Sequence, residues 1–204
     1  MKKQEIRDLI LQMVGANLLG TGFRLRKRES AFIRGIPGGW QHIGLPLYDY
    51  NPVFVFSLNI CIRIDAVEDI FNMFSGIESK FQSTTATTMT RLEYFTGGSG
   101  EYSVATADDI ASAGRVLSGV FRDKIIPFFD ENKDAKALDR AVNCTEPGID
   151  STQPPAGPMH AIILARVAGN PDFDGLVDEI RRRMGLSPEV DHVFNRLVKY
   201  LKTR

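Results

Sequence analysis

Two side chains in this sequence could support nucleophilic chemistry, the thiol of Cys61 and the imidazole of His42. A cysteine becomes a nucleophile when a neighbouring base helps to form its thiolate. Both residues lie in apolar segments that we predict to be strands, so pairing of these strands would bring them together. This arrangement would suit a small hydrolase or transferase. A buried thiol without a chemical role is the commoner situation for such a cysteine.

A run of basic residues offers a second kind of chemistry. Arg24, Arg26 and Arg28 alternate with Phe23 and Leu25, which predicts a strand with cations on one face. Such a face matches the phosphates of a nucleic acid. The same charges would also protect an exposed edge strand from pairing with another chain. Lys plus Arg and Asp plus Glu both total 25, and this balance argues against a nucleic-acid partner.

Polar residues inside the most strongly alternating stretch of the chain are further candidates for binding. Ser57, Asn59 and Arg63 share one face there, and with Thr85 and Thr87 they could form the floor of a groove closed by the C-terminal helices. A plain solvated sheet face explains the same residues. The binding residues that we select are Arg24, Arg26, Arg28, Trp40, Ser57, Asn59 and Arg63.

No metal or cofactor site is predicted. The three histidines share no ligand spacing, and Cys144 with His160 supplies fewer protein ligands than zinc normally takes. The sequence also lacks a phosphate-binding P-loop, a dinucleotide fingerprint and a G-x-S-x-G nucleophile elbow. We therefore expect no metal and no cofactor.

The stretch that must position most of these residues is 52–64. Its apolar side chains recur at every second position, at Phe54, Phe56, Leu58, Ile60, Ile62 and Ile64. A period of two predicts one strand with a buried face and a face partly open to solvent. We expect this strand to run through the centre of the sheet, because it buries so many large side chains.

The remaining elements are predicted around this strand. Further strands are expected at 23–28, 30–36, 40–47, 83–94 and 101–105. Pro46 lacks the N–H of a central strand, so we expect an edge or a bend there. Helical spacing predicts helices at 4–19, 65–75, 106–125, 134–143, 159–168, 171–184 and 187–201. Asp65 and Glu68 are spaced like a capping box, and Pro127 should kink or end its helix.

These elements predict an α+β fold, with an antiparallel β-meander sheet flanked by helices and a C-terminal all-helical segment. Residues 146–158 are rich in Pro, Gly, Ser and Thr, which is typical of a boundary. We predict a sheet domain at 1–145 and a three-helix cap or subdomain at 156–204.

Composition places the chain among ordinary globular proteins. Hydrophobic residues make up 43% and charged residues 25% of its 204 residues. Two cysteines do not make a disulfide framework, so we expect a reduced, cytoplasmic protein. Neither a signal peptide nor a membrane-spanning run is indicated, and we expect no membrane partner.

The order of several segments resembles a bacterial family of domains of unknown function. These segments are a first helix, Gly22-Phe23 with a basic strand, Trp40-Gln41-x-Ile43, an alternating strand through Leu58-Asn59, and a later long helix. The resemblance covers residues 5–143. It implies a small, stand-alone cytosolic α+β protein, and it carries over no catalytic residue because the family has none assigned.

The sequence favours a non-enzymatic cytosolic protein that binds another macromolecule, for example by neutralising a protein partner as immunity proteins do. Two alternatives remain open. One is a hydrolase or transferase that uses Cys61 and His42, and the other is a nucleic-acid binder that uses the strand Arg24–Arg28. The sequence does not indicate the partner or the oligomeric state.

Overall fold

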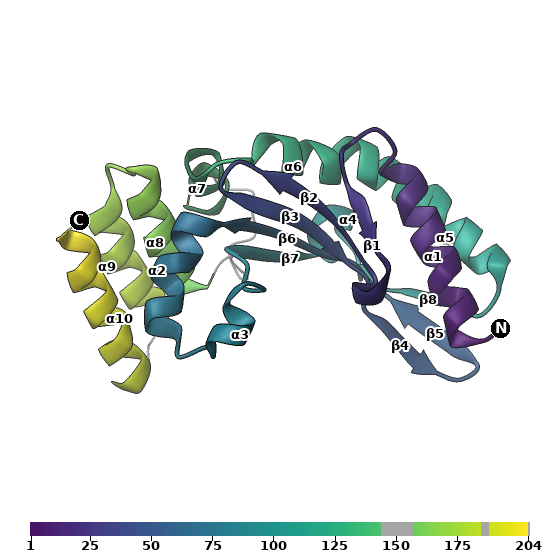
Figure 1. The fold of residues 1–204 in the computed structure, drawn as a ribbon, viewed down its shortest axis with the longest axis horizontal. Coiled ribbons are helices and arrows are strands. Elements are labelled where there is room, and N and C mark those ends of the chain that lie inside the picture. The colour runs from purple at the N-terminus through teal and green to yellow at the C-terminus, as the bar shows by residue number, and fades with distance from the viewer. Residues whose placement is uncertain (144–156, 185–187, 204) are drawn as a thin grey trace. The chain divides into compact units, whose positions relative to one another are not determined.

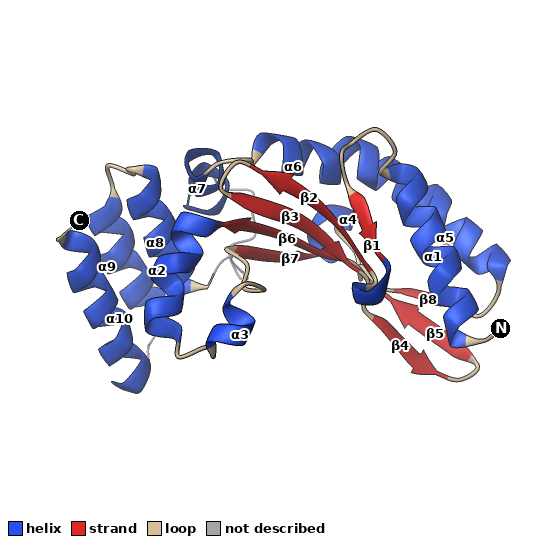
Figure 2. Cartoon of the chain, in the orientation of Figure 1, coloured by secondary structure: helices blue, strands red, loops and turns tan. Residues whose placement is uncertain are grey.

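The computed structural model describes residues 1–143, 157–184 and 188–203, and the chain has the expected α+β fold (Figures 1 and 2). Two antiparallel sheets, of five and three strands, are flanked by helices, and the C-terminal part is helical. Cys144 and most of the predicted boundary at 146–158 lie outside the described residues.

The strands form two sheets with the orders β1-β2-β3-β6-β7 and β4-β5-β8. Their bounds are β1 Arg24–Arg26, β2 Ala31–Ile36, β3 Gly39–Gly44, β4 Leu47–Tyr50, β5 Val53–Phe56, β6 Asn59–Ile64, β7 Thr88–Arg91 and β8 Tyr102–Val104. The first three strands follow one another as the predicted meander does. The chain then leaves for the second sheet and returns at β6, beside β3.

The α-helices of the described residues are α1 Lys3–Asn17, α2 Asp65–Ser75, α3 Ser79–Gln82, α4 Glu93–Thr96, α5 Ala107–Val120, α6 Ile126–Glu131, α7 Ala135–Asn143, α8 Pro158–Ala168, α9 Phe173–Met184 and α10 Pro188–Lys202. A short 3-10 helix, η1 Lys27–Glu29, follows β1, and a π-helical turn, η2 Phe121–Ile125, joins α5 to α6. Of the two outcomes expected at Pro127, a kink or an end of the helix, the end is not found, because α6 continues past this residue. It lies in α6 directly after the wider π turn η2, and such a turn is a common way for a helix to accommodate a local irregularity.

The chain divides into two compact units, whose residue ranges alternate along the sequence. The first unit consists of Met1–Ile36, Trp40–Ile62 and Met89–Glu131, and the second consists of Pro37–Gly39, Arg63–Thr88 and Asn132–Arg204. Strands β6 and β7 run from one unit into the other. The C-terminal helices thus share a unit with α2 and α7.

The single strand predicted at 52–64 is wrong, because this stretch forms two strands in different sheets. β5 lies between β4 and β8, whereas β6 lies between β3 and β7. At the break, the Ser57 hydroxyl donates to the Gly100 carbonyl at 2.9 Å, and the Leu58 carbonyl accepts the N–H of Leu92 at 3.1 Å. All six alternating apolar side chains are nevertheless buried, so the predicted core face is confirmed.

The opposite face of residues 52–64 is more deeply buried than predicted. Ser57, Cys61 and Arg63 are all buried. Pro46 does mark a bend, since β3 ends at Gly44 and β4 begins at Leu47 in the other sheet. The strand predicted at 83–94 is shorter than expected, because β7 covers only Thr88–Arg91 and helix α4 follows it.

Candidate functional site

Side chains of the five-stranded sheet in the first unit alternate between a face covered by helices and an opposite face. A methyl group on Gly15 of α1 would lie 3.4 Å from the Phe32 ring. Gln41 donates to the Phe129 carbonyl of α6 at 2.6 Å, and Arg34 Nε donates to Gln41 Oε1 at 2.8 Å. Phe32, Arg34 and Gln41 therefore mark the covered face, and α6 runs along it in Figure 1.

Strands β1 and β3 show which residues lie on the opposite face. Leu25 stands opposite Phe32 in the β1–β2 register, so Arg24 and Arg26 point away from the helices. Trp40 and His42 alternate with Gln41 and share that side, with their ring centroids 5.8 Å apart in an edge arrangement.

Strands β6 and β7 extend this face. A methyl group on Gly44 would lie 3.0 Å from His42 Cε1 and 3.8 Å from Asn59 Cβ, so Asn59 shares the face with His42. Met89 and Arg91 are exposed, whereas Thr88 and Thr90, which alternate with them, are buried like Ile60 and Ile62 of β6. We define the open face as Arg24, Arg26, Trp40, His42, Asn59, Met89 and Arg91.

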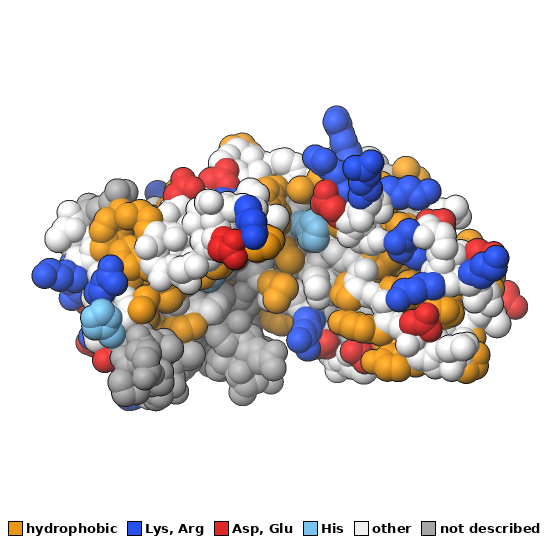
Figure 3. Space-filling view, turned by 60° about the horizontal axis from the view of Figure 1, so that its bottom comes forward, with side chains coloured by type: hydrophobic (Ala, Val, Ile, Leu, Met, Phe, Trp, Pro, Cys, Tyr) orange, Lys and Arg blue, Asp and Glu red, His pale blue; other side chains and the backbone are white. Residues whose placement is uncertain are grey.

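Positive charge gathers at one end of the open face. Arg24, Arg26, Lys27 and Arg28 are exposed, and within the described part of the chain none of their side chains makes an ion pair or hydrogen bond. Figure 3 shows a cluster of Lys and Arg side chains at the top of that view, with an acidic side chain beside it. The basic strand predicted from the sequence is therefore exposed to solvent, and its segment carries a net positive charge.

The predicted binding residues fall into two groups. Arg24, Arg26, Trp40 and Asn59 come together on the open face, and Arg28 follows β1 in the exposed helix η1. Ser57 and Arg63 do not join them as free polar groups. Ser57 is buried at the break between the sheets, and Arg63 belongs to the second unit.

Cys61 and His42 share the open side of neighbouring strands, but the thiol is not activated. Burial raises the pKa of Cys61 to about 12, so the thiol is neutral at pH 7. Burial lowers the pKa of His42, and the charge of Glu29 partly offsets this. A reactive cysteine has its pKa shifted in the opposite direction. The enzyme hypothesis thus gains no support from the electrostatics of this pair.

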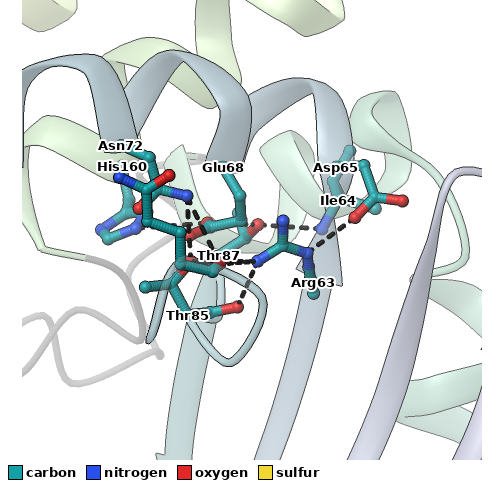
Figure 4. Close-up of polar contacts among 9 residues, drawn as sticks. Arg63, Ile64, Asp65, Glu68, Asn72, Thr85, Thr87 and His160 are labelled. Carbon is teal, nitrogen blue, oxygen red and sulfur yellow. Dashed lines mark hydrogen bonds and ion pairs between the residues drawn. The ribbon is translucent and has the colours of Figure 1, made fainter. Parts of the chain in front are cut away.

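Arg63 holds a loop of the second unit in place (Figure 4). Its Nε donates to Asp65 Oδ1 at 2.6 Å, and its Nη1 donates to the carbonyls of Gln82 and Thr85 at 2.8 and 2.9 Å. The guanidinium is nearly inaccessible to solvent. Because its donors already serve the backbone of residues 82–85, Arg63 has a structural role.

Beside Arg63, a fully buried carboxylate joins α2 to α8 (Figure 4). Glu68 Oε1 accepts from Thr87 Oγ1 at 2.9 Å, and Thr87 Oγ1 accepts the N–H of Ile64 at 2.9 Å. His160 Nε2 lies 3.2 Å from the same carboxylate oxygen without forming a regular hydrogen bond to it. The His160 ring also stacks on Phe71, with centroids 3.8 Å apart.

The environment of Glu68 favours its ionised form. Burial alone would raise the pKa of this carboxyl, but contact with His160, Thr85 and Thr87 outweighs burial and lowers it. The capping role expected for Glu68 is wrong, because Ile64 precedes the first turn of α2 and no side chain caps it. The sequence does contain one indication of this contact: His160 is the only polar residue in the apolar run Met159–Ala165, so it needs a polar partner if the run is buried.

The described residues contain no cluster of three or more His, Cys, Asp or Glu side chains that could hold a metal ion. None of their helices combines the length and apolar character that a bilayer crossing requires. Comparison with protein-family models, curated proteins and solved structures finds no match to this chain. The family resemblance seen in the sequence therefore stays a prediction.

Proposed function

We propose that this protein is a non-enzymatic binding protein and that the open face contacts a protein partner. One observation carries the proposal: the half-buried Trp40 and the exposed Met89 lie on the same sheet face as Arg24, Arg26 and Arg91. Tryptophan, methionine and arginine are among the residue types enriched at protein interfaces, and tryptophan and arginine are also enriched among hot spots.

The arrangement of these residues also fits an interface. β1 and β7 are the two edge strands of the five-stranded sheet, and β3 and β6 lie between them. Trp40, His42 and Asn59 thus occupy the middle, while the arginines occupy the margins. An apolar or aromatic centre with a charged rim is the usual anatomy of a protein interface.

A photocrosslinking amino acid at position 89 would test the proposal in cells of the source organism. Met89 is 59% exposed, and Val116 on α5 is a matched control because it is 58% exposed and lies outside the open face. We expect a discrete protein adduct from position 89 and none from position 116. The adduct should disappear when Trp40→Ala is added, in a variant whose circular dichroism matches the parent.

Two results would contradict the proposal. One is a set of adducts that is the same at positions 89 and 116, which would indicate random collisions. The other is an adduct at 89 that Trp40→Ala leaves unchanged. If the partner is identified, expressing it alone and together with this chain would test whether binding neutralises it.

A further inference from the structure

Resting on the proposed function, we infer that the partner presents a surface rich in carboxylates to the open face. The first argument is local charge. The whole chain carries equal numbers of acidic and basic residues. Segment 23–30, in contrast, contains four basic residues, Arg24, Arg26, Lys27 and Arg28, and a single acidic residue, Glu29. Four exposed cations without partners in the described residues favour an anionic ligand.

The second argument is the position of the arginines on the two edges of the sheet. Arg24 and Arg26 lie on β1, and Arg91 lies on β7 at the opposite edge. Arg91 is only weakly engaged, because its Nη1 is 3.9 Å from Glu93 Oε1 and its side chain is 69% exposed. A partner that covers the middle strands would meet positive charge on both sides. Arginine binds carboxylates with paired hydrogen bonds, which fixes the orientation of the partner.

The third argument distinguishes carboxylates from the phosphates of a nucleic acid. The middle of the open face carries Trp40, His42 and Asn59, and Met89 borders it. This surface suits amino-acid side chains, whereas nucleic-acid affinity comes from neutralising many phosphates, and the arginines of this face lie only on its two edge strands. The balanced charge of the chain also provides no long-range field for nucleic acid.

The fluorescence of Trp40 provides a direct test, because Trp40 is the only tryptophan of the chain. The purified full-length protein is titrated with a glutamate-rich peptide, a lysine-rich peptide of equal length and single-stranded oligothymidylate. We expect the glutamate-rich peptide alone to change the emission saturably. Its affinity should fall about tenfold between low and moderate salt, because the attraction is electrostatic.

Charge reversal at the edge of the face sharpens the test. Arg24→Glu with Arg26→Glu should weaken binding of the glutamate-rich peptide about 10- to 100-fold. Arg115→Glu with Arg140→Glu is the control, because it changes the net charge equally at exposed positions on α5 and α7. The control should bind like the parent. All four positions are exposed, so both variants should fold.

Several outcomes would overturn the inference. A response to oligothymidylate instead of the glutamate-rich peptide would assign the face to nucleic acid. An absent response to the glutamate-rich peptide, equal responses to both peptides, or equal losses in the two double variants would also refute it. A different outcome is capture at position 89 of a protein whose affinity changes neither with salt nor on charge reversal at Arg24 and Arg26. In that case the proposed function stands, and only the acidic character of the partner is refuted.

Discussion

His160 Nε2 lies 3.2 Å from Oε1 of Glu68, and the Glu68 side chain is entirely shielded from solvent. This contact joins α8 to α2 within the second unit. A buried carboxylate is costly unless its charge is compensated. Thr87 donates a hydrogen bond to the carboxylate and His160 lies beside it, so we regard these residues as part of the structural core of this unit.

Replacing His160 by Phe should preserve the stack on Phe71 while removing the partner of Glu68. We expect a loss of about 1 to 3 kcal/mol in the free energy of unfolding, because the buried carboxylate loses its polar neighbour. Urea denaturation followed by circular dichroism would measure it. His192→Phe on α10 is the matched control, since His192 is exposed and should change stability by less than about 0.5 kcal/mol. Equal stability of the two variants would contradict the structural role.

The lowered pKa of Glu68 predicts how stability changes with pH. Since the pKa in the folded state lies below the ordinary value of about 4.5, the ionised carboxylate stabilises the fold above that pH. This contribution is lost as the pH falls through the folded-state pKa. Between pH 6 and pH 3, the wild type should therefore lose more free energy of unfolding than Glu68→Gln. Asp109 and Asp123, whose pKa values are also lowered, titrate in both proteins and cancel in the comparison. Parallel curves would refute the prediction.

Gly39 lies where β3 approaches the backbone of Arg63. A methyl group at Gly39 would lie only 1.9 Å from the Arg63 carbonyl oxygen, so the backbone would have to move. We expect Gly39→Ala to destabilise the protein by about 2 to 3 kcal/mol. Gly35→Ala is the control, because a methyl group there meets nothing within 4 Å. Thermal unfolding of both variants would decide, and a Gly39→Ala protein as stable as Gly35→Ala would show that the strands separate easily.

Much of the fold follows from the sequence because side-chain periodicity reports burial. The alternation from Phe54 to Ile64 correctly identifies six core residues. It does not reveal the break between β5 and β6, since Ser57 and Leu58 keep the same alternation while the chain passes from one sheet to the other. Periodicity specifies which face a residue occupies but not which strand lies beside it.

The candidate site was predictable in its residues but not in its assembly. Arg24, Arg26, Trp40 and Asn59 stand out by type, yet their common face depends on the register that places Leu25 opposite Phe32 and on the contact at Gly44. Register is a tertiary property that a single strand does not encode. The Glu68–His160 contact is likewise a tertiary property that the sequence analysis did not predict, because α2 and α8 are far apart in the sequence.

Alkylation of Cys61 would separate the binding hypothesis from the enzyme alternative. Cys61 is buried, and its pKa is raised to about 12, so little thiolate exists at pH 8. We expect iodoacetamide to leave this thiol unmodified in the folded protein and to modify it fully in urea. Cys144→Ser should be present in the tested protein, so that mass spectrometry reports Cys61 alone. Rapid alkylation of the folded protein, slowed by His42→Ala, would instead identify an activated nucleophile and revive the hydrolase or transferase reading.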